Sequence, residues 1–215
     1  MVVSIVGGHG QIALALTELL AAKGVEVRSL IRNPDHSADV REAGGDPAVV
    51  DFETATDAEI DVAVAGSDVV VFAAGAGPGS GPERKETVDY GAAVRLIEAA
   101  RRNGSPRYVM ISAVRADPDY PGEEVFAVYQ RAKGRADAEL GRSGLDHLIV
   151  RPVRLTDEPP TGRVALVRDT EALESEYVPR RDVAAVLAEV ITNHPEAGGI
   201  LNLSAGKTEI PQAFG

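Results

Sequence analysis

The chain has 215 residues, of which 44% are hydrophobic and 26% are charged, as in ordinary globular proteins. This length predicts one domain, residues 1–215, with a sizeable core. The formal net charge of −11 argues against nucleic acid or an anionic membrane as a partner. The chain contains no cysteine, which excludes disulfides and thiolate sites. No segment resembles a signal peptide or a membrane span, so we expect a cytoplasmic protein.

Residues 1–33 predict a βαβ unit, around which the rest of the chain is organised. Val2–Val6 is short, apolar and rich in β-branched residues, as in a buried strand. A glycine loop, Gly7–Gly10, follows and leads into an amphipathic helix over Gln11–Lys23. A second apolar strand spans Val25–Ile31, and the crossover between the two strands should be right-handed.

The glycine loop predicts a binding site for a dinucleotide. Gly7 can turn the backbone sharply, Gly10 lets a pyrophosphate approach the chain, and Ala13 allows close contact between helix and strand. The N-terminus of the helix then presents free N–H groups to the phosphates. The spacing is G-x-x-G-x-x-A, which differs from the commonest fingerprint, G-x-G-x-x-G. Its place between a strand and a helix favours dinucleotide binding over an ordinary glycine-rich turn.

The end of the second strand bears on the choice between NAD and NADP. The strand ends at Ile31-Arg32-Asn33 without an acidic residue that would bind the ribose hydroxyls. Arg32 is therefore the candidate to bind a 2′-phosphate, and Arg28, inside the strand, is a weaker one. The alternative is that Arg32 is a solvated arginine. We favour NADP(H) over NAD(H).

The remaining pattern predicts an α/β fold, a Rossmann-type doubly wound parallel sheet with a small C-terminal substrate lobe from about Pro152 onward. Helices are expected at Pro34–Ala43, Thr56–Ala65, Glu83–Asn103, Glu123–Arg142 and Arg181–Asn193. Strands are expected at Pro47–Val50, Val69–Ala74, Arg107–Ser112, Leu145–Val150, Arg163–Arg168 and Ile200–Ser204, and Gly75–Pro82 should be a flexible loop. The carboxyl ends of the strands should ring one crevice, where ligands bind in such folds.

Three polar residues near that crevice could carry a reaction. Tyr129 and Lys133 are four residues apart and share one face of a predicted helix, and Ser112 ends a strand. A tyrosine can donate a proton to a carbonyl oxygen, and a neighbouring ammonium lowers its pKa. A serine hydroxyl can hold the substrate oxygen. The alternative is a half-buried tyrosine beside a solvated lysine.

Together with the glycine loop, this set resembles the short-chain dehydrogenase/reductase superfamily, and most closely its atypical members with an NAD(P)H-binding, NmrA-like or flavin/biliverdin reductase-like domain. The resemblance rests on GGHGQIA, LIRNP, VVDF, VVVFAAGAG, VDYGAAVRLIEAARRNG, RYVMISA, YQRAKGRADAEL, SGLDHLIVRPVRL and RRDVAAVLAEVI. One departure is the absence of a clear counterpart to the active-site asparagine of long-chain members; the nearest residues are Val88, Asp89 and Tyr90.

The resemblance implies a role for each matching residue. Ser112, Tyr129 and Lys133 would be catalytic, with Lys133 also touching the nicotinamide ribose. The cofactor would contact Gly7, Gly8, His9, Gly10, Gln11 and Ile12 at the pyrophosphate, Arg32 at the 2′-phosphate, Asp51 and Phe52 at the adenine, Ala73, Ala74 and Gly75 at the adenine ribose, and Pro152 and Val153 at the nicotinamide amide.

These observations predict an NAD(P)H-dependent oxidoreductase that reduces a small carbonyl or conjugated substrate. One alternative is a non-catalytic NADP(H)-binding redox sensor, and a less favoured one is an epimerase or dehydratase of the nucleotide-sugar type. His36, His147 and His194 are scattered without metal-ligand spacing, so we expect no metal site. A homodimer through Glu83–Asn103 and Glu123–Arg142 is common in the superfamily, although no residue here requires it.

Overall fold

The computed structural model describes residues 1–77 and 79–214; Pro78, within the predicted flexible loop, and Gly215 lie outside the described residues. The strands are β1 (Val2–Val6), β2 (Glu26–Ile31), β3 (Asp46–Val49), β4 (Val69–Phe72), β5 (Arg107–Ile111), β6 (Asp146–Pro152), β7 (Arg154–Thr156), β8 (Arg163–Val167), β9 (Tyr177–Pro179), β10 (Gly199–Ala205) and β11 (Thr208–Glu209). The helices are α1 (Gln11–Ala22), α2 (Ser37–Glu42), α3 (Asp57–Val64), α4 (Pro82–Arg84), a π-helical segment (Lys85–Ala92), α5 (Ala93–Asn103), α6 (Val125–Arg142) and α7 (Arg180–Asn193).

The central sheet confirms the predicted Rossmann-type fold. Its strand order is β11-β8-β10-β6-β5-β4-β1-β2-β3. The strands from β3 to β10 in this order are all parallel. At the edge beyond β10, β8 pairs antiparallel with β10, and β11 pairs antiparallel with β8. The order reverses between β1 and β4, and in doubly wound sheets ligands bind at such a point, beyond the carboxyl ends of the strands.

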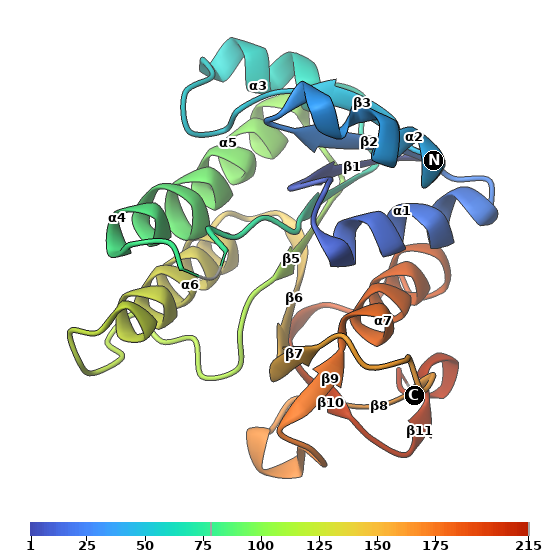
Figure 1. Ribbon diagram of the computed structural model, residues 1–215, viewed down its shortest axis with the longest axis vertical. Helices are drawn as coiled ribbons and strands as arrows, with labels where there is room; N and C mark the ends of the chain where they lie inside the picture. Colours follow the sequence, from blue (N-terminus) through green and yellow to red (C-terminus); the bar gives the residue numbers. More distant parts are fainter. Residues whose placement is uncertain (78, 215) are drawn as a thin grey trace.

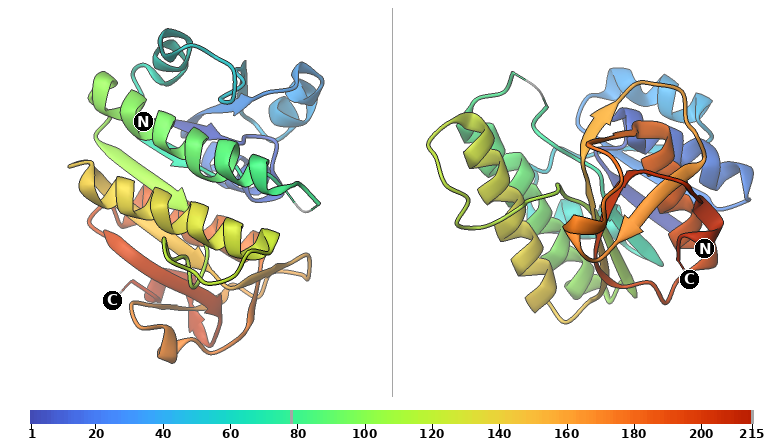
Figure 2. Two further views of the ribbon diagram at one scale, coloured as in Figure 1. Left: turned by 90° about the vertical axis from the view of Figure 1, so that its left-hand side faces the viewer. Right: turned by 90° about the horizontal axis from the view of Figure 1, so that it is seen from below.

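Helices cover both faces of this sheet (Figure 1). On one face α1 and α7 pack together over buried residues such as Ile5, Leu16 and Val186. On the other face α3, α5 and α6 cover a second apolar cluster that includes Phe72 and Leu96. Figure 2 shows α5 and α6 lying side by side across that face. In the described ranges, no helix is long and apolar enough to cross a membrane.

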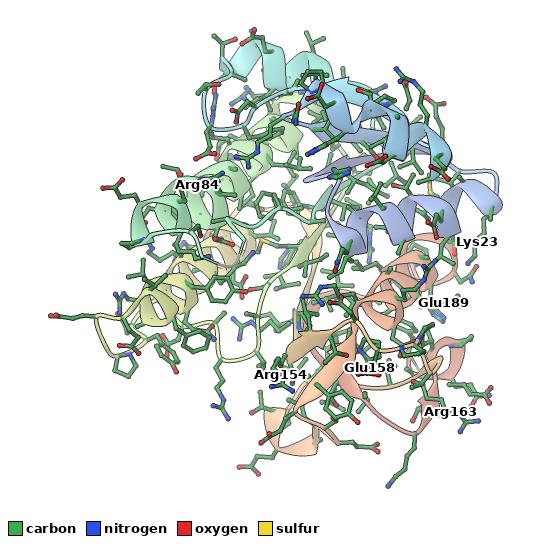
Figure 3. All side chains as sticks on the ribbon, viewed as in Figure 1. Lys23, Arg84, Arg154, Glu158, Arg163 and Glu189 are labelled. Atoms are coloured by element: carbon green, nitrogen blue, oxygen red, sulfur yellow. The ribbon has the colours of Figure 1, made fainter. Side chains whose placement is uncertain are left out.

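The C-terminal residues from Pro152 onward mostly extend the main sheet. β8, β10 and β11 add to its edge, while β7 and β9 form a separate two-stranded parallel sheet. Lys23 at the end of α1 lies 3.7 Å from Glu189 of α7, so this part of the chain is tied to the first βαβ unit (Figure 3).

The helix predicted over Glu83–Asn103 differs from a regular α-helix. It begins at Pro82 as α4, widens into the π-helical segment Lys85–Ala92 and continues as α5. Hydrophobic periodicity cannot separate a π-helical turn from an α-helical one in so short a segment. Such turns are frequent at functional sites.

A loop before α6 packs closely against that helix. The backbone N–H of Asp117 donates to the Gln130 carbonyl at 3.3 Å, and Arg131 donates to the carbonyls of Tyr120 and Gly122. A Cβ atom at Gly134 would overlap backbone atoms of Asp117 and Pro118. Glycine at 134 therefore lets this loop reach α6.

We expect Gly134→Ala to lower the free energy of unfolding by about 2 kcal/mol, because the backbone of the loop would have to move. Gly141→Ala on the same helix is the matched control, since a Cβ there meets nothing within 4 Å. It should stabilise the protein by about 0.5–1 kcal/mol through helix propensity. Urea denaturation of both variants measures the difference, and equal effects would contradict the packing described.

Candidate functional site

The glycine loop between β1 and α1 is pressed against the neighbouring strands. Gly7 has a φ of +81°, and a Cβ on it would lie 2.7 Å from the Cα of Ala74, just beyond β4. A Cβ on Gly8 would lie 2.6 Å from the Cβ of Ser29 in β2. Only glycine fits both positions, so the loop runs close to the carboxyl ends of the strands, where a dinucleotide could lie against its backbone.

The start of α1 leaves backbone donors open. Gly8 donates its N–H to Leu30 at 3.0 Å and Gly10 donates to Gly7 at 2.8 Å, so these two amides are already used. Gly10 is the N-cap of α1, which has no side-chain cap and no acidic residue in its first turn. The first N–H groups of a helix carry partial positive charge and bind anions such as phosphate. The loop therefore fits a pyrophosphate.

A cavity of about 340 Å³ adjoins this loop. Its lining includes predicted cofactor residues from four strand ends: Gly7, His9, Gly10, Arg32, Asp51, Phe52, Ala73, Ala74 and Gly75. Other predicted residues do not line this cavity: Gly8 is buried within the loop, Gln11 is exposed, and Pro152 and Val153 are buried at the end of β6. Ile12 lines a second, neighbouring cavity.

A carboxylate lies beside Arg32 that the strand-end analysis missed. Glu53 follows β3 rather than β2, and its Oε2 atom is 3.7 Å from Nη1 of Arg32. Glu53 also accepts hydrogen bonds from Arg84 at 2.7 Å and Thr87 at 2.6 Å. Arg84 stands at the start of the long helix (Figure 3). Arg32 and Arg84 line this cavity together with two carboxylates, Glu53 and Asp51, so its charged side chains balance.

These contacts keep Glu53 ionised. Partial burial raises the pKa of Glu53, but the hydrogen bonds from Thr87 and Arg84 and the charges of Arg84 and Arg32 outweigh it, so that the pKa lies below its usual value. Arg28, the weaker candidate for a 2′-phosphate, donates instead to the carbonyls of Ala63 and Ala65 and does not line the cavity.

His9 is held in place by two neighbours. Its Nε2 atom lies 2.7 Å from a carboxylate oxygen of Asp39, and its ring stacks on that of His36 with the centroids 3.6 Å apart. Both histidines line the first cavity. Within residues 1–77 and 79–214, no cluster of three or more histidine and acidic side chains could hold a metal ion.

The second cavity, of about 470 Å³, contains all three predicted catalytic residues. Ser112, Tyr129 and Lys133 line it together with Ile12, Ala73, Ala74, Gly75, Gly77, Gly79, Ser80, Lys85, Asp89, Ile111, Val125, Phe126 and Leu155. The two cavities share the segment Ala73–Gly75 after β4. The three residues therefore face a cavity that adjoins the one beside the glycine loop.

Lys133 is fixed by a buried ion pair. Its Nζ atom donates to the carbonyl of Ile111 at 3.2 Å and lies 3.4 Å from Oδ1 of Asp89. The side chains are only 4% and 1% exposed. Asp89 also accepts the N–H of Ala76 at 3.3 Å. In the sequence, Asp89 is one of the residues nearest the position where long-chain members have an active-site asparagine, and the resemblance gives it no role. The structure places its carboxylate beside Lys133.

The environment of Tyr129 keeps its hydroxyl protonated. Burial raises the pKa of Tyr129, and the carboxylates of Asp89 and Asp137 raise it further, whereas Lys133 lowers it. The net pKa is above the usual value. The expected lowering by Lys133 is present, but burial and the two carboxylates outweigh it.

Asp137 extends the same face of α6, four residues beyond Lys133. Its Oδ2 atom accepts from Nε of Arg151 at 2.8 Å. Burial raises the pKa of Asp137, while Arg151, the nearby Ser112 hydroxyl and Lys133 oppose the rise. Ser112 Oγ and the second oxygen of Asp137 are buried, and neither has a well-formed hydrogen bond to the described residues. The Ser112 hydroxyl thus lies close to the Asp137 carboxylate, whose pKa it lowers, at the edge of the second cavity.

Comparisons with known proteins agree with this geometry. A family model described as NAD(P)H-binding matches residues 7–194. A Bacillus subtilis protein named as an uncharacterized sugar epimerase is 32% identical over 215 residues, which is 100% of this chain and 99% of the relative.

The chain is also similar to solved structures of proteins described as NAD-dependent or as oxidoreductases. A candidate NAD-dependent epimerase/dehydratase from Bacillus halodurans is 35% identical with a TM-score of 0.91, covering 100% of this chain and 98% of the other. An oxidoreductase from Lactococcus lactis is 25% identical with a TM-score of 0.84, covering 100% and 95%. The chain belongs to the NAD(P)H-binding family of Rossmann-fold proteins.

Proposed function

We propose that the protein is an NADPH-dependent oxidoreductase that reduces a small carbonyl or conjugated substrate. The observation that carries this proposal is the second cavity, in which Ser112, Tyr129 and Lys133 face one space next to the glycine loop. A protein that only bound the nucleotide would not need a proton donor, an ammonium and a hydroxyl together at this place.

Each of the three residues has a distinct role. When bound, NADPH supplies the hydride that the substrate carbon accepts. Tyr129 donates its proton to the substrate oxygen, which suits a hydroxyl whose raised pKa keeps it protonated. Lys133 stabilises the phenolate left on Tyr129 and holds the nicotinamide ribose. Ser112 donates a hydrogen bond that fixes the substrate oxygen.

The cofactor would occupy the first cavity and the glycine loop. The N–H groups of His9, Gln11 and Ile12 would bind the pyrophosphate, with Gly7, Gly8 and Gly10 shaping the loop. Asp51 and Phe52 would flank the adenine, Ala73, Ala74 and Gly75 its ribose, and Pro152 and Val153 the nicotinamide amide. Arg32, whose side chain is 58% exposed, would bind the 2′-phosphate of NADP(H).

A second candidate is an epimerase, because the Bacillus subtilis relative carries that description and the Bacillus halodurans structure is assigned to epimerases and dehydratases. An epimerase returns the hydride to its substrate, so it consumes no NADPH overall. A screen of aldehydes, ketones, enones and nucleotide sugars distinguishes the reductase from the epimerase. It follows NADPH absorbance, which falls only in a net reduction, and the stereochemistry of the product. Tight NADPH binding without any turnover would instead favour a redox sensor.

Arg32→Ala should weaken NADPH binding about tenfold or more, because a charged hydrogen bond to the 2′-phosphate is lost. NADH binding should change little. Arg28→Ala is the control, since that arginine points to the carbonyls of Ala63 and Ala65. Fluorescence titration with both nucleotides measures the effect. An unchanged preference in Arg32→Ala would refute the assignment of the 2′-phosphate site.

Tyr129→Phe should lower kcat by about 10²- to 10⁴-fold on any reduced substrate that the screen finds, because the proton donor is removed. NADPH affinity should stay within a factor of about two. Steady-state kinetics together with a binding titration separate the two effects. A variant that keeps its full kcat would show that another group donates the proton.

The ionisation of Tyr129 tests the electrostatics of the site directly. Lys133→Met should raise the pKa of Tyr129 further, because the ammonium that favours the phenolate is gone. Asp89→Asn should lower it, because a carboxylate that disfavours the phenolate is gone. Ultraviolet titration of tyrosinate, with Tyr129→Phe subtracted as background, measures both shifts. Shifts of the opposite sign would contradict the site described.

A further inference from the structure

A second lysine, Lys85, lies in the catalytic cavity and has no part in the roles given above. It is the first residue of the π-helical segment and is 8% exposed. Its Nζ atom lies 5.5 Å from the centroid of the Tyr129 ring and donates to the carbonyl of Gly77 at 3.0 Å. The ammonium of Lys85 therefore stands beside the proposed proton donor.

The charge of Lys85 is not neutralised by the part of the chain that the structure describes. No described carboxylate lies within 4.0 Å of its Nζ atom, whereas Lys133 in the same cavity is paired with Asp89. A lysine ammonium has three donors, and only one of them has a partner among the described residues. Burying an ammonium without a counter-ion is costly unless another group compensates for it.

The lining of the cavity is otherwise suited to an apolar body. Ile12, Ile111 and Leu155 line it, and Val125 and Phe126 are exposed at 42% and 54%. The charged residues of the lining are Lys85, Lys133 and Asp89, which leaves one positive charge in a protein whose net charge is −11. A local positive field of this kind attracts an anion.

From this juxtaposition we infer that the substrate of the proposed reductase is an acid: an apolar carbonyl or conjugated compound whose carboxylate binds the ammonium of Lys85 while its reacting oxygen faces Tyr129 and Ser112. The inference rests on the proposed function, because it assigns the second cavity to the substrate. Lys85 would thus determine which carbonyl compounds are accepted.

A cofactor phosphate is the other anion that could reach an ammonium near this site. Lys85 does not line the cavity next to the open end of α1, where the pyrophosphate fits, and it is found only in the lining shared with Tyr129. This placement favours the substrate. The two sources differ in an observable way, since loss of Lys85 would weaken NADPH binding only if a phosphate were its partner.

The test uses two aldehydes that differ in charge, 4-carboxybenzaldehyde and methyl 4-formylbenzoate. Each is titrated by calorimetry into the wild-type protein saturated with NADP⁺, which has no hydride to transfer, and into Lys85→Met and Lys85→Arg in the same state. Lys207→Met is the matched control, because the side chain of Lys207 is 92% exposed and lies outside both cavities. NADPH affinity and thermal unfolding are measured for every variant.

The wild type and Lys207→Met should bind the carboxylate about tenfold or more tightly than the ester, as expected for one charged hydrogen bond. Lys85→Met should lose this preference and Lys85→Arg should keep most of it, with NADPH affinity unchanged in both. If the wild type binds the two aldehydes equally, or binds neither, the inference is overturned. This result depends on the wild type alone, so it holds even if Lys85→Met fails to fold. Weakened NADPH binding in Lys85→Met also overturns it, in favour of a cofactor phosphate. Failure of the wild type to bind NADPH at all would instead be a failure of the proposed function.

Discussion

The site depends on the buried ion pair between Lys133 and Asp89. The pair joins α6 to the π-helical segment, and its two members also bind the Ile111 carbonyl at the end of β5 and the Ala76 N–H after β4. Removing one partner of a buried pair typically costs about 3–5 kcal/mol, because the other charge is left without compensation. The fold itself therefore sets the position of the lysine, before any ligand arrives.

The parts of the fold that follow from local pattern were predictable. The β1–α1–β2 unit has its strand, glycine turn and helix in direct succession, and Tyr129 and Lys133 lie one turn apart on α6. Both features depend on spacing along the chain alone. The convergence of Ser112 with them followed from the rule that parallel strands end at one edge.

Other features depend on distant segments that pattern does not connect. Glu53, which follows β3, lies beside Arg32 at the end of β2. Asp89 on the π-helical segment pairs with Lys133 on α6. The net pKa of Tyr129 could not be judged from Lys133 alone, because it is raised first by burial and then by carboxylates that come from elsewhere in the chain or lie a further turn along α6. β7, β9 and β11 span only two or three residues each, which is too few to show any periodicity.

The π-helical segment makes the lining of the catalytic cavity sensitive to chain length as well as to composition. An α-helix turns by about 100° per residue, so loss of one residue between Lys85 and Asp89 would rotate one side chain by roughly that angle relative to the other. Asp89 is anchored by Lys133, and the rotation would therefore fall on Lys85. A single-residue deletion during evolution could in this way remove a positive charge from the cavity while leaving Ser112, Tyr129 and Lys133 in place. Two proteins with the same reactive residues would then accept different substrates.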